Sequence, residues 1–323
     1  MKRLIDMEVQ IEVTNACHLQ CSNCTRFVGH HVKPYFMPRE QVTAALQSLE
    51  KHPKLVGIMG GEPLLHPDFE WICEEARKYF PREQLGLWTG LPHNDRFLRY
   101  RTAIVETFYS IFINDHSRGD IYHAPLLVSA KSVYEKKYPD DPVKAEREMW
   151  NTIDACWVQN SWSKAINPKG AFFCEVAAAQ SILYDGPEGW KVEKDWWTRS
   201  PRDYREQMEQ WCPGCGAACS LKRRVSTDER DDISPDNLER LKAVGSRKVK
   251  HDLYQISDLQ LVEHPEEMAK YKDTEWRNQV ASRYGMFLTI NSLRYWEPHL
   301  KPRWDPTAPK RVSLFEEIKA GVV

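Results

Sequence analysis

Short apolar runs recur through the first 130 residues of the chain, separated by longer stretches of mixed polarity. Between these runs, apolar side chains return every three or four positions, as from Val42 to Leu49, and Pro38 fits the first turn of a helix there. The predicted strands cover residues 8–13, 55–59, 84–89, 108–113 and 125–129. Strands that alternate with helices at this spacing predict an α/β fold built from parallel βαβ units.

Residues able to carry chemistry follow four of these predicted strands. They are Cys17, Cys21, Cys24, Gly60, Gly61, Glu62, Pro63, Thr89 and Asn114. In parallel barrels and half-barrels, the active site lies at the carboxyl ends of the strands. We therefore expect these residues to meet at one edge of the sheet.

The first three cysteines lie four and then three positions apart. Thiolates are soft ligands that suit an iron–sulfur cluster or a zinc ion. A four-iron cluster held by three cysteines has one iron without a protein ligand, whereas a structural zinc site needs a fourth ligand, for which His18, His30 or His31 could serve. The cysteine spacing leaves both readings open.

Composition restricts the compartment and the partners. The chain has 323 residues and a formal net charge of −1, which argues against bulk electrostatic capture of nucleic acid or of an anionic membrane. No apolar run approaches the roughly 20 residues that cross a bilayer, and the first residues do not resemble a secretory signal. We therefore expect a cytoplasmic protein, in which clustered cysteines are metal ligands rather than disulfides.

A second group of cysteines falls in a region that differs in composition. Residues 150–211 contain seven of the twelve tryptophans, which we expect mostly to pack in a small core. Turn residues 167–170 predict a hairpin whose second strand runs over 171–174. The cysteines here are Cys156, Cys174, Cys212, Cys215 and Cys219. The region is predicted to be a second, smaller module.

Three other features have an ordinary structural interpretation. Cys73 lies in the apolar stripe of a predicted helix and is expected to pack in the core. His116 and His123 lie near predicted strand ends, where a substrate could be deprotonated, but a structural role is the default for each. Residues 222–224, Lys-Arg-Arg, are expected to form a solvated face.

Two motifs together resemble a known family. Cys17, Cys21 and Cys24 form a Cx3Cx2C motif, and the Gly-Gly-Glu-Pro sequence at residues 60–63 follows the next predicted strand. In this order and at these strand ends, they resemble the radical S-adenosylmethionine (radical SAM) superfamily. The resemblance favours the cluster over the zinc site, which would not require the glycine motif.

The resemblance implies a role for each of these residues. The three cysteines would hold a [4Fe–4S] cluster whose fourth iron binds SAM, and a 5′-deoxyadenosyl radical would abstract a hydrogen atom from the substrate. Gly60 and Gly61 would let the backbone approach the methionyl ammonium group of SAM, with Glu62 beside it. Pro63 completes the motif, and Thr89 and Asn114 would add polar contacts to SAM. Asn23 departs from the family pattern, which often has an aromatic residue before the third cysteine.

The later cysteines resemble the Twitch module, a shortened SPASM domain, of radical SAM dehydrogenases. Cys156 and Cys174, with a hairpin between them, and then Cys212 and Cys215 match its arrangement and imply a second [4Fe–4S] cluster with four protein ligands. Cys219 is an additional thiol that could replace one of them. The alternative is a zinc ribbon made from the same cysteines.

The resemblance implies a partial (β/α)6 TIM-like barrel over residues 1–150, a cysteine-rich Twitch-like module over 151–220, and an extension over 221–323 with no assigned role. The expected function is hydrogen abstraction from a small polar metabolite, such as a sugar, aminocyclitol or nucleotide-sugar, giving dehydrogenation or epimerisation. The expected partners are this substrate and an electron donor such as flavodoxin or ferredoxin. Two alternatives stay open: modification of a ribosomally made peptide, and a zinc-stabilised binding protein.

Overall fold

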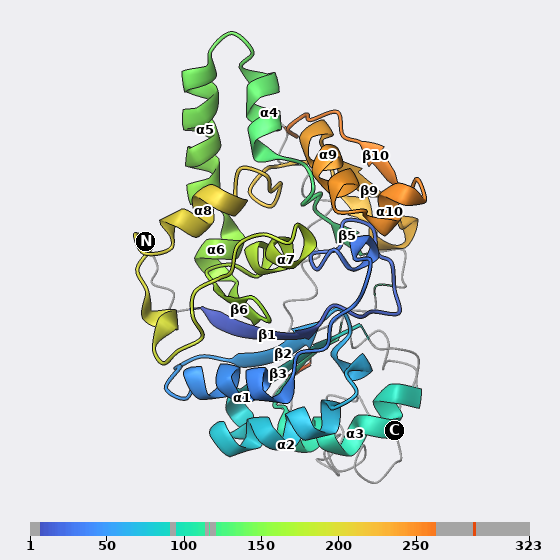
Figure 1. The fold of residues 1–323 in the computed structure, drawn as a ribbon, viewed down its shortest axis with the longest axis vertical. Coiled ribbons are helices and arrows are strands. Elements are labelled where there is room, and N and C mark those ends of the chain that lie inside the picture. The colour runs from blue at the N-terminus through green and yellow to red at the C-terminus, as the bar shows by residue number, and fades with distance from the viewer. Residues whose placement is uncertain (1–6, 91–94, 114–115, 117–120, 263–286, 289–323) are drawn as a thin grey trace, which may run out of the picture.

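A computed structural model of the chain describes residues 7–90, 95–113, 116, 121–262 and 287–288. Seven strands form one sheet (Figure 1). In spatial order they are β11 (Phe287–Leu288), β4 (Ser110–Ile113), β3 (Leu85–Thr89), β2 (Val56–Gly60), β1 (Glu8–Thr14), β6 (Ser163–Asn167) and β7 (Gly170–Phe172). The first six strands pair in parallel, and β7 pairs antiparallel with β6. The α/β class with a parallel sheet is thereby confirmed.

Side chains of β1 alternate between two faces of this sheet, as in any strand. Val9, Ile11 and Val13 join a hydrophobic core with the helices that cover one face. These helices are α1 (Arg39–Ser48), α2 (Phe69–Tyr79) and α3 (Asp95–Thr107). The other face is covered by α6 (Trp157–Ser161) and α7 (Glu175–Leu183), and Figure 1 shows the sheet between the two layers. Gln10 and Glu12 of β1 therefore point toward this second layer.

Five further helices and two short strand pairs of the described residues lie above the sheet in the view of Figure 1. Helices α4 and α5 form a projecting hairpin, and α9, α10, β9 and β10 form a small lobe beside β5. The helices are α4 (Ala130–Lys137), α5 (Pro142–Asp154), α8 (Arg205–Trp211), α9 (Pro235–Ala243) and α10 (Arg247–Lys250). The short strand pairs are β9 (Asp231–Ile233) with β10 (Tyr254–Ile256), and β5 (Tyr122–His123) with β8 (Arg224–Val225). Single turns of 3-10 helix are η2 (Val28–His30), η3 (Pro63–Leu65), η4 (Arg82–Gln84), η5 (Trp196–Thr198) and η6 (Ser226–Asp228).

Four of the five predicted strands of the first 150 residues are present, as is the hairpin at residues 167–170, where Gly170 has a φ of 123°. The predicted strand at residues 125–129 is wrong. This segment is a turn in which Val128 N donates to Pro125 O, and Ser129 then caps α4. Its apolar side chains are buried, but its Leu126 and Leu127 carbonyls bond to Gly216 N and Ser234 N instead of to a strand.

The sheet does not end near residue 150. Strand β6 pairs directly with β1, so part of the region predicted as a second module extends the same sheet. Trp196 and Trp197 of this region are buried in the core that α1 covers, in agreement with the packing interpretation of the tryptophans. Cys73 is fully buried in the same core, as expected. No helix in the described part of the chain is both long and apolar enough to cross a membrane.

Candidate functional site

A loop over residues 15–38, here called the cysteine loop, leaves the carboxyl end of β1 and carries the first three cysteines. Leu19 N donates a hydrogen bond to Cys17 Sγ at 3.4 Å. Burial raises the pKa of Cys17 to about 12, and the neighbouring charge of Cys24 acts in the same direction. Burial also raises the pKa of Cys21, with further contributions from the charges of Cys24 and Cys17. Each of these two thiols is thus within electrostatic range of another cysteine of the motif.

The glycine motif at the end of β2 packs directly against the start of the cysteine loop. Gly61 N donates to Thr14 O at 2.7 Å, and Glu62 N donates to Ala16 O at 2.7 Å. A Cβ atom on Gly60 would lie 2.3 Å from Thr14 O, and one on Gly61 would lie 2.4 Å from Ala16 O. Both glycines are therefore needed for the backbone to approach this closely. This structural role had not been expected from the sequence, and contact of the glycines with SAM stays a prediction.

The carboxylate of Glu62 joins the ends of β2 and β3. It is fully buried and accepts hydrogen bonds from Leu64 N at 3.1 Å, Thr89 Oγ1 at 2.9 Å and Gly90 N at 2.8 Å. The predicted site residues Glu62 and Thr89 are thus in direct contact, and Pro63 begins the short helix η3 beside them. Asn114, the other predicted SAM contact, lies outside the described residues.

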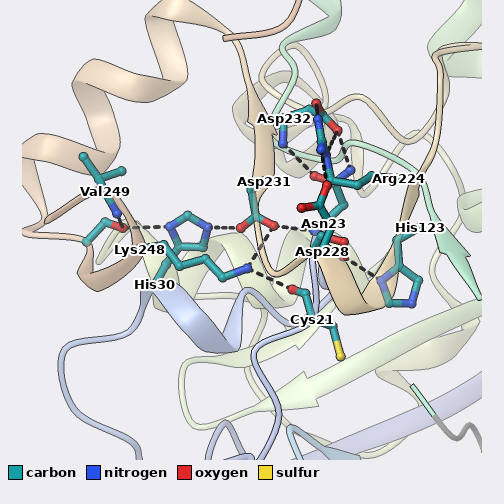
Figure 2. Close-up of polar contacts among 12 residues, drawn as sticks. Cys21, Asn23, His30, His123, Arg224, Asp228, Asp231, Asp232, Lys248 and Val249 are labelled. Atoms are coloured by element: carbon teal, nitrogen blue, oxygen red, sulfur yellow. Dashed lines mark hydrogen bonds and ion pairs between the residues drawn. The ribbon is translucent and has the colours of Figure 1, made fainter. Parts of the chain in front are cut away.

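Asn23, the residue that departs from the family pattern, fastens the cysteine loop to β9 (Figure 2). Its backbone has a φ of 49°, a left-handed conformation that asparagine tolerates better than most residues. Its N–H donates to Asp231, and its side chain donates to Asp232 Oδ2 at 2.8 Å and accepts from Asp232 N at 2.9 Å. An aromatic residue at this position would lack these polar contacts.

Lys248 of α10 adds a second connection to the cysteine loop (Figure 2). This lysine is 1% exposed, and its Nζ donates to Cys21 O at 2.9 Å and to Asp231 Oδ1 at 3.0 Å. His30 Nε2 lies 2.5 Å from Asp231 Oδ2, and His30 Nδ1 lies 2.7 Å from Ser246 Oγ. Burial opposes ionisation of Asp231, but His30 and Lys248 lower the pKa of that carboxyl overall. We call Asn23, His30, Asp231 and Lys248 the anchoring network.

The cysteine loop is also held on the side of β5 and β8. Ser22 N donates to Ser226 O at 2.9 Å, and His123 Nδ1 lies 2.7 Å from Ser22 O. The expected solvated face over residues 222–224 is wrong for Arg224, whose side chain is 17% exposed because it pairs with Asp232 at 2.7 Å. The sequence did not predict that residues 222–248 hold the cysteine loop in place.

The two histidines near the predicted strand ends face each other. The rings of His116 and His123 have centroids 4.7 Å apart. Burial lowers the pKa of His116 to about 3 and also lowers the pKa of His123. Both imidazoles are therefore neutral near pH 7, and His123 has the structural role of contacting the cysteine loop.

Four cysteines of the second group line one buried pocket between α5, α7 and α8: Cys156, Cys174, Cys212 and Cys215. Cys219 is not among the described residues that line it. Burial raises the pKa of Cys174 to about 12, and the charge of Cys156 acts in the same direction. Ala217 N donates to Cys215 Sγ at 3.4 Å.

These donors fit a thiolate-ligated cluster, because backbone N–H groups that bond to sulfur stabilise the thiolate. Among the residues that the structure describes, no three His, Cys, Asp or Glu side chains converge closely enough to hold a single metal ion. The assignment of cluster ligands in both groups stays a prediction.

Arg26 lies between the two groups of cysteines. Its guanidinium is within electrostatic reach of both Cys24 and Cys174. Its Nη1 is 3.6 Å from Glu12 Oε2, and its Nη2 is 3.3 Å from Glu175 Oε1. Burial raises the pKa of Glu12 to about 7, against the opposing charge of Arg26. This interior ion pair was not anticipated from the sequence, where an arginine in a loop carries no sign that it is buried.

Several polar atoms around Arg26 are buried without a hydrogen-bond partner among the described residues. They are Gln10 Nε2 and Oε1, Glu12 Oε2, and the Nε, Nη1 and Nη2 atoms of Arg26. A buried polar atom without a partner costs about 1–3 kcal/mol, so such atoms usually pair with water or with a ligand. Their concentration on the inner face of β1 marks a polar interior.

A comparison with known families finds a match over the part of the chain that carries this geometry. The radical SAM superfamily matches residues 11–104, which include the cysteine loop and the glycine motif. No curated protein matches the chain.

Three solved structures are similar at low sequence identity. The crystal structure of BtrN in complex with AdoMet and 2-DOIA has a TM-score of 0.43 and 15% identity, covering 67% of this chain and 94% of that chain. BtrN in an open conformation has a TM-score of 0.39 and 14% identity, covering 66% of this chain and 88% of that chain. HydG, a maturase of the [FeFe]-hydrogenase, has a TM-score of 0.28 and 10% identity, covering 81% of this chain and 62% of that chain. At these scores the likenesses carry no argument about function.

The part of the chain that builds the cysteine loop and the glycine motif, residues 11–104, is thus similar to the radical SAM superfamily, whose enzymes use a [4Fe–4S] cluster and SAM.

Proposed function

We propose that this enzyme abstracts a hydrogen atom from a small polar metabolite, such as a sugar, aminocyclitol or nucleotide-sugar, in a dehydrogenation or epimerisation. One observation supports the radical chemistry above all others. The loop that carries Cys17, Cys21 and Cys24 begins against the end of β2, where Gly61 N and Glu62 N donate to Thr14 O and Ala16 O, within the region that matches the superfamily. We assign Cys17, Cys21 and Cys24 as ligands of a [4Fe–4S] cluster that leaves one iron for SAM.

When bound, the cluster and SAM supply a 5′-deoxyadenosyl radical that removes the hydrogen atom. The protein holds the cysteine loop in position through the two glycines and the anchoring network. Glu62, fixed by Thr89, places a negative charge at the strand ends, where the ammonium group of SAM would bind. Gly60, Gly61, Pro63 and Asn114 are proposed to complete the SAM site.

The polar interior supports a substrate rich in hydroxyl or amino groups. Gln10 and Arg26 offer donors, and Glu12 Oε2 offers an acceptor, that make no hydrogen bond among the described residues, although Arg26 and Glu12 form an ion pair. A hydrophilic substrate would satisfy these atoms, whereas an apolar one would leave them buried and unpaired. Arg26 would then hold the substrate between the two groups of cysteines.

The second group is proposed to hold an auxiliary [4Fe–4S] cluster. Cys156, Cys174, Cys212 and Cys215 line one pocket, and Arg26 is within electrostatic reach of Cys174 in that group. A cluster held there would supply a site that accepts an electron from the substrate or holds the substrate.

Formation of 5′-deoxyadenosine tests the proposed radical chemistry. Protein reconstituted anaerobically with iron and sulfide is incubated with SAM and dithionite, and the product is measured by mass spectrometry. We expect the wild-type protein to form 5′-deoxyadenosine and the C17A/C21A/C24A variant to form none above background, because the latter lacks the ligands of the SAM-binding cluster.

The matched control is Cys73→Ser. It also removes a thiol, but Cys73 is fully buried in the core and belongs to neither group of cysteines. It should retain product formation. Product from the triple variant at the wild-type rate would refute the ligand assignment, and no product from fully loaded wild-type protein would refute the radical chemistry. Addition of deuterated sugars or aminocyclitols tests the substrate class, since the true substrate should transfer deuterium into 5′-deoxyadenosine.

A further inference from the structure

A pocket of about 300 Å³ opens to solvent beside the cysteine loop, on the side of α10. It is lined by Gln20, Arg247, Lys248, His251 and Leu253. Gln20 is exposed and directly precedes Cys21, and Lys248 in the pocket wall donates to Cys21 O. At this pocket, therefore, the first group of cysteines comes close to the protein surface.

The surface around the pocket is basic. Arg247, Lys250 and Lys33 are exposed, and within the described part of the chain none of the three forms an ion pair. His251 is also exposed, and Asp252 is the one acidic residue in the stretch 247–252. This local excess of cations contrasts with the formal net charge of −1 of the whole chain.

An exposed apolar side chain lies among these cations. Val32 is 62% exposed, and Lys33 follows it in the chain. A Cβ atom built on Gly245 would lie 3.3 Å from Lys250 Nζ and 3.9 Å from Val32 Cγ2, so Lys250 and Val32 are neighbours on one surface. Protein interfaces commonly combine apolar contacts with a charged rim, which a site for a small anion would not need.

We propose that this surface docks an electron-carrier protein whose contact face is acidic, of the flavodoxin type. We call it the α10 patch and define it as Gln20, Val32, Lys33, Arg247, Lys250 and His251. The inference rests on the proposed function, which requires an electron at the cluster held by Cys17, Cys21 and Cys24. In the transfer, the reduced carrier is oxidised by one electron and the cluster is reduced by one electron, and no bond forms or breaks.

The location and the charge both favour this occupant. Exposed cations without ion-pair partners attract an acidic protein and raise its rate of association. The contact would bring the carrier against the exposed Gln20, which directly precedes Cys21, so the electron would have only the cysteine loop to cross.

The test uses the reconstituted full-length protein with flavodoxin, its reductase and NADPH. The R247E/K250E variant reverses two exposed charges of the patch. We expect its Kd for flavodoxin, measured by calorimetry at low salt, to rise about tenfold or more, with a matching rise in the flavodoxin concentration needed for half-maximal 5′-deoxyadenosine formation. Dithionite-driven formation should be unchanged, because dithionite does not require docking. The single variant Lys33→Glu should show a smaller change in the same direction.

The control K51E/K194E reverses two exposed lysines outside the patch and should bind flavodoxin as the wild type does. Equal Kd values for the wild type and R247E/K250E would overturn the docking proposal. So would an equal rise in the Kd of the control variant, or no measurable binding of flavodoxin by the wild type. Failure of the proposed function gives a different result: dithionite would then drive no 5′-deoxyadenosine formation in any variant, whatever the Kd for flavodoxin.

Discussion

Replacement of Lys248 by methionine is expected to lower the free energy of unfolding by about 3–5 kcal/mol, the usual cost of removing one partner of a buried ion pair. Methionine fills a similar volume but cannot donate to Cys21 O or pair with Asp231. Asp231 would then stay fully buried, with hydrogen bonds to only His30 and the Asn23 N–H among the described residues. Urea unfolding followed by circular dichroism measures the change.

The control for this prediction lies two residues away. Lys250 is exposed and forms no ion pair within the described residues, so Lys250→Met should change the free energy of unfolding by no more than about 0.5 kcal/mol. Similar unfolding midpoints for Lys248→Met and Lys250→Met would show that the anchoring network does not stabilise the protein. Because Lys248 bonds to the backbone of Cys21, we also expect the Lys248→Met protein to lose iron from the first site faster in air.

Removal of the second group of thiols is expected to halve the iron content. Wild-type protein reconstituted anaerobically should contain about eight iron atoms per chain, since each [4Fe–4S] cluster holds four, and the C156A/C174A/C212A/C215A variant should contain about four. The reason is that these four thiols line one pocket, and none of the first three cysteines lines it. Iron and acid-labile sulfide are measured on the same sample.

Two other cysteines give matched controls for this measurement. Cys219 does not line the pocket, and Cys73 lies in the core under the sheet, so Cys219→Ala and Cys73→Ala should each keep about eight iron atoms. Four iron atoms in the wild type, or zinc in place of iron in the second site, would contradict the auxiliary cluster. A loss of four iron atoms from Cys219→Ala would instead make Cys219 a ligand.

The strands could be predicted from the sequence because a buried parallel strand requires a short apolar run. The same property explains the error at residues 125–129, since a buried turn also needs apolar side chains, and its hydrogen bonds go to residues distant in the sequence. That β6 pairs with β1 could not be predicted either. The partner of a parallel strand depends on the path of the chain between them, which periodicity does not encode.

The candidate site was predictable where local motifs carry it. Glu62 and Thr89 meet as expected, because consecutive parallel strands place their carboxyl ends side by side. The anchoring network could not be predicted, because Asp231 and Lys248 lie more than 200 residues from Cys21 and resemble surface charges in sequence. Asn23 did give a signal, since it departs from the family pattern, but only the structure shows that it pairs with β9.

The central claim is that the first three cysteines hold a cluster with one iron open to SAM. Its most direct test is the electron paramagnetic resonance spectrum of the dithionite-reduced C156A/C174A/C212A/C215A variant, in which only the first site can contribute. We predict a [4Fe–4S] signal whose g values shift when SAM is added, because SAM coordinates the open iron. A signal that SAM leaves unchanged, or protein that holds zinc and gives no signal, would contradict the account.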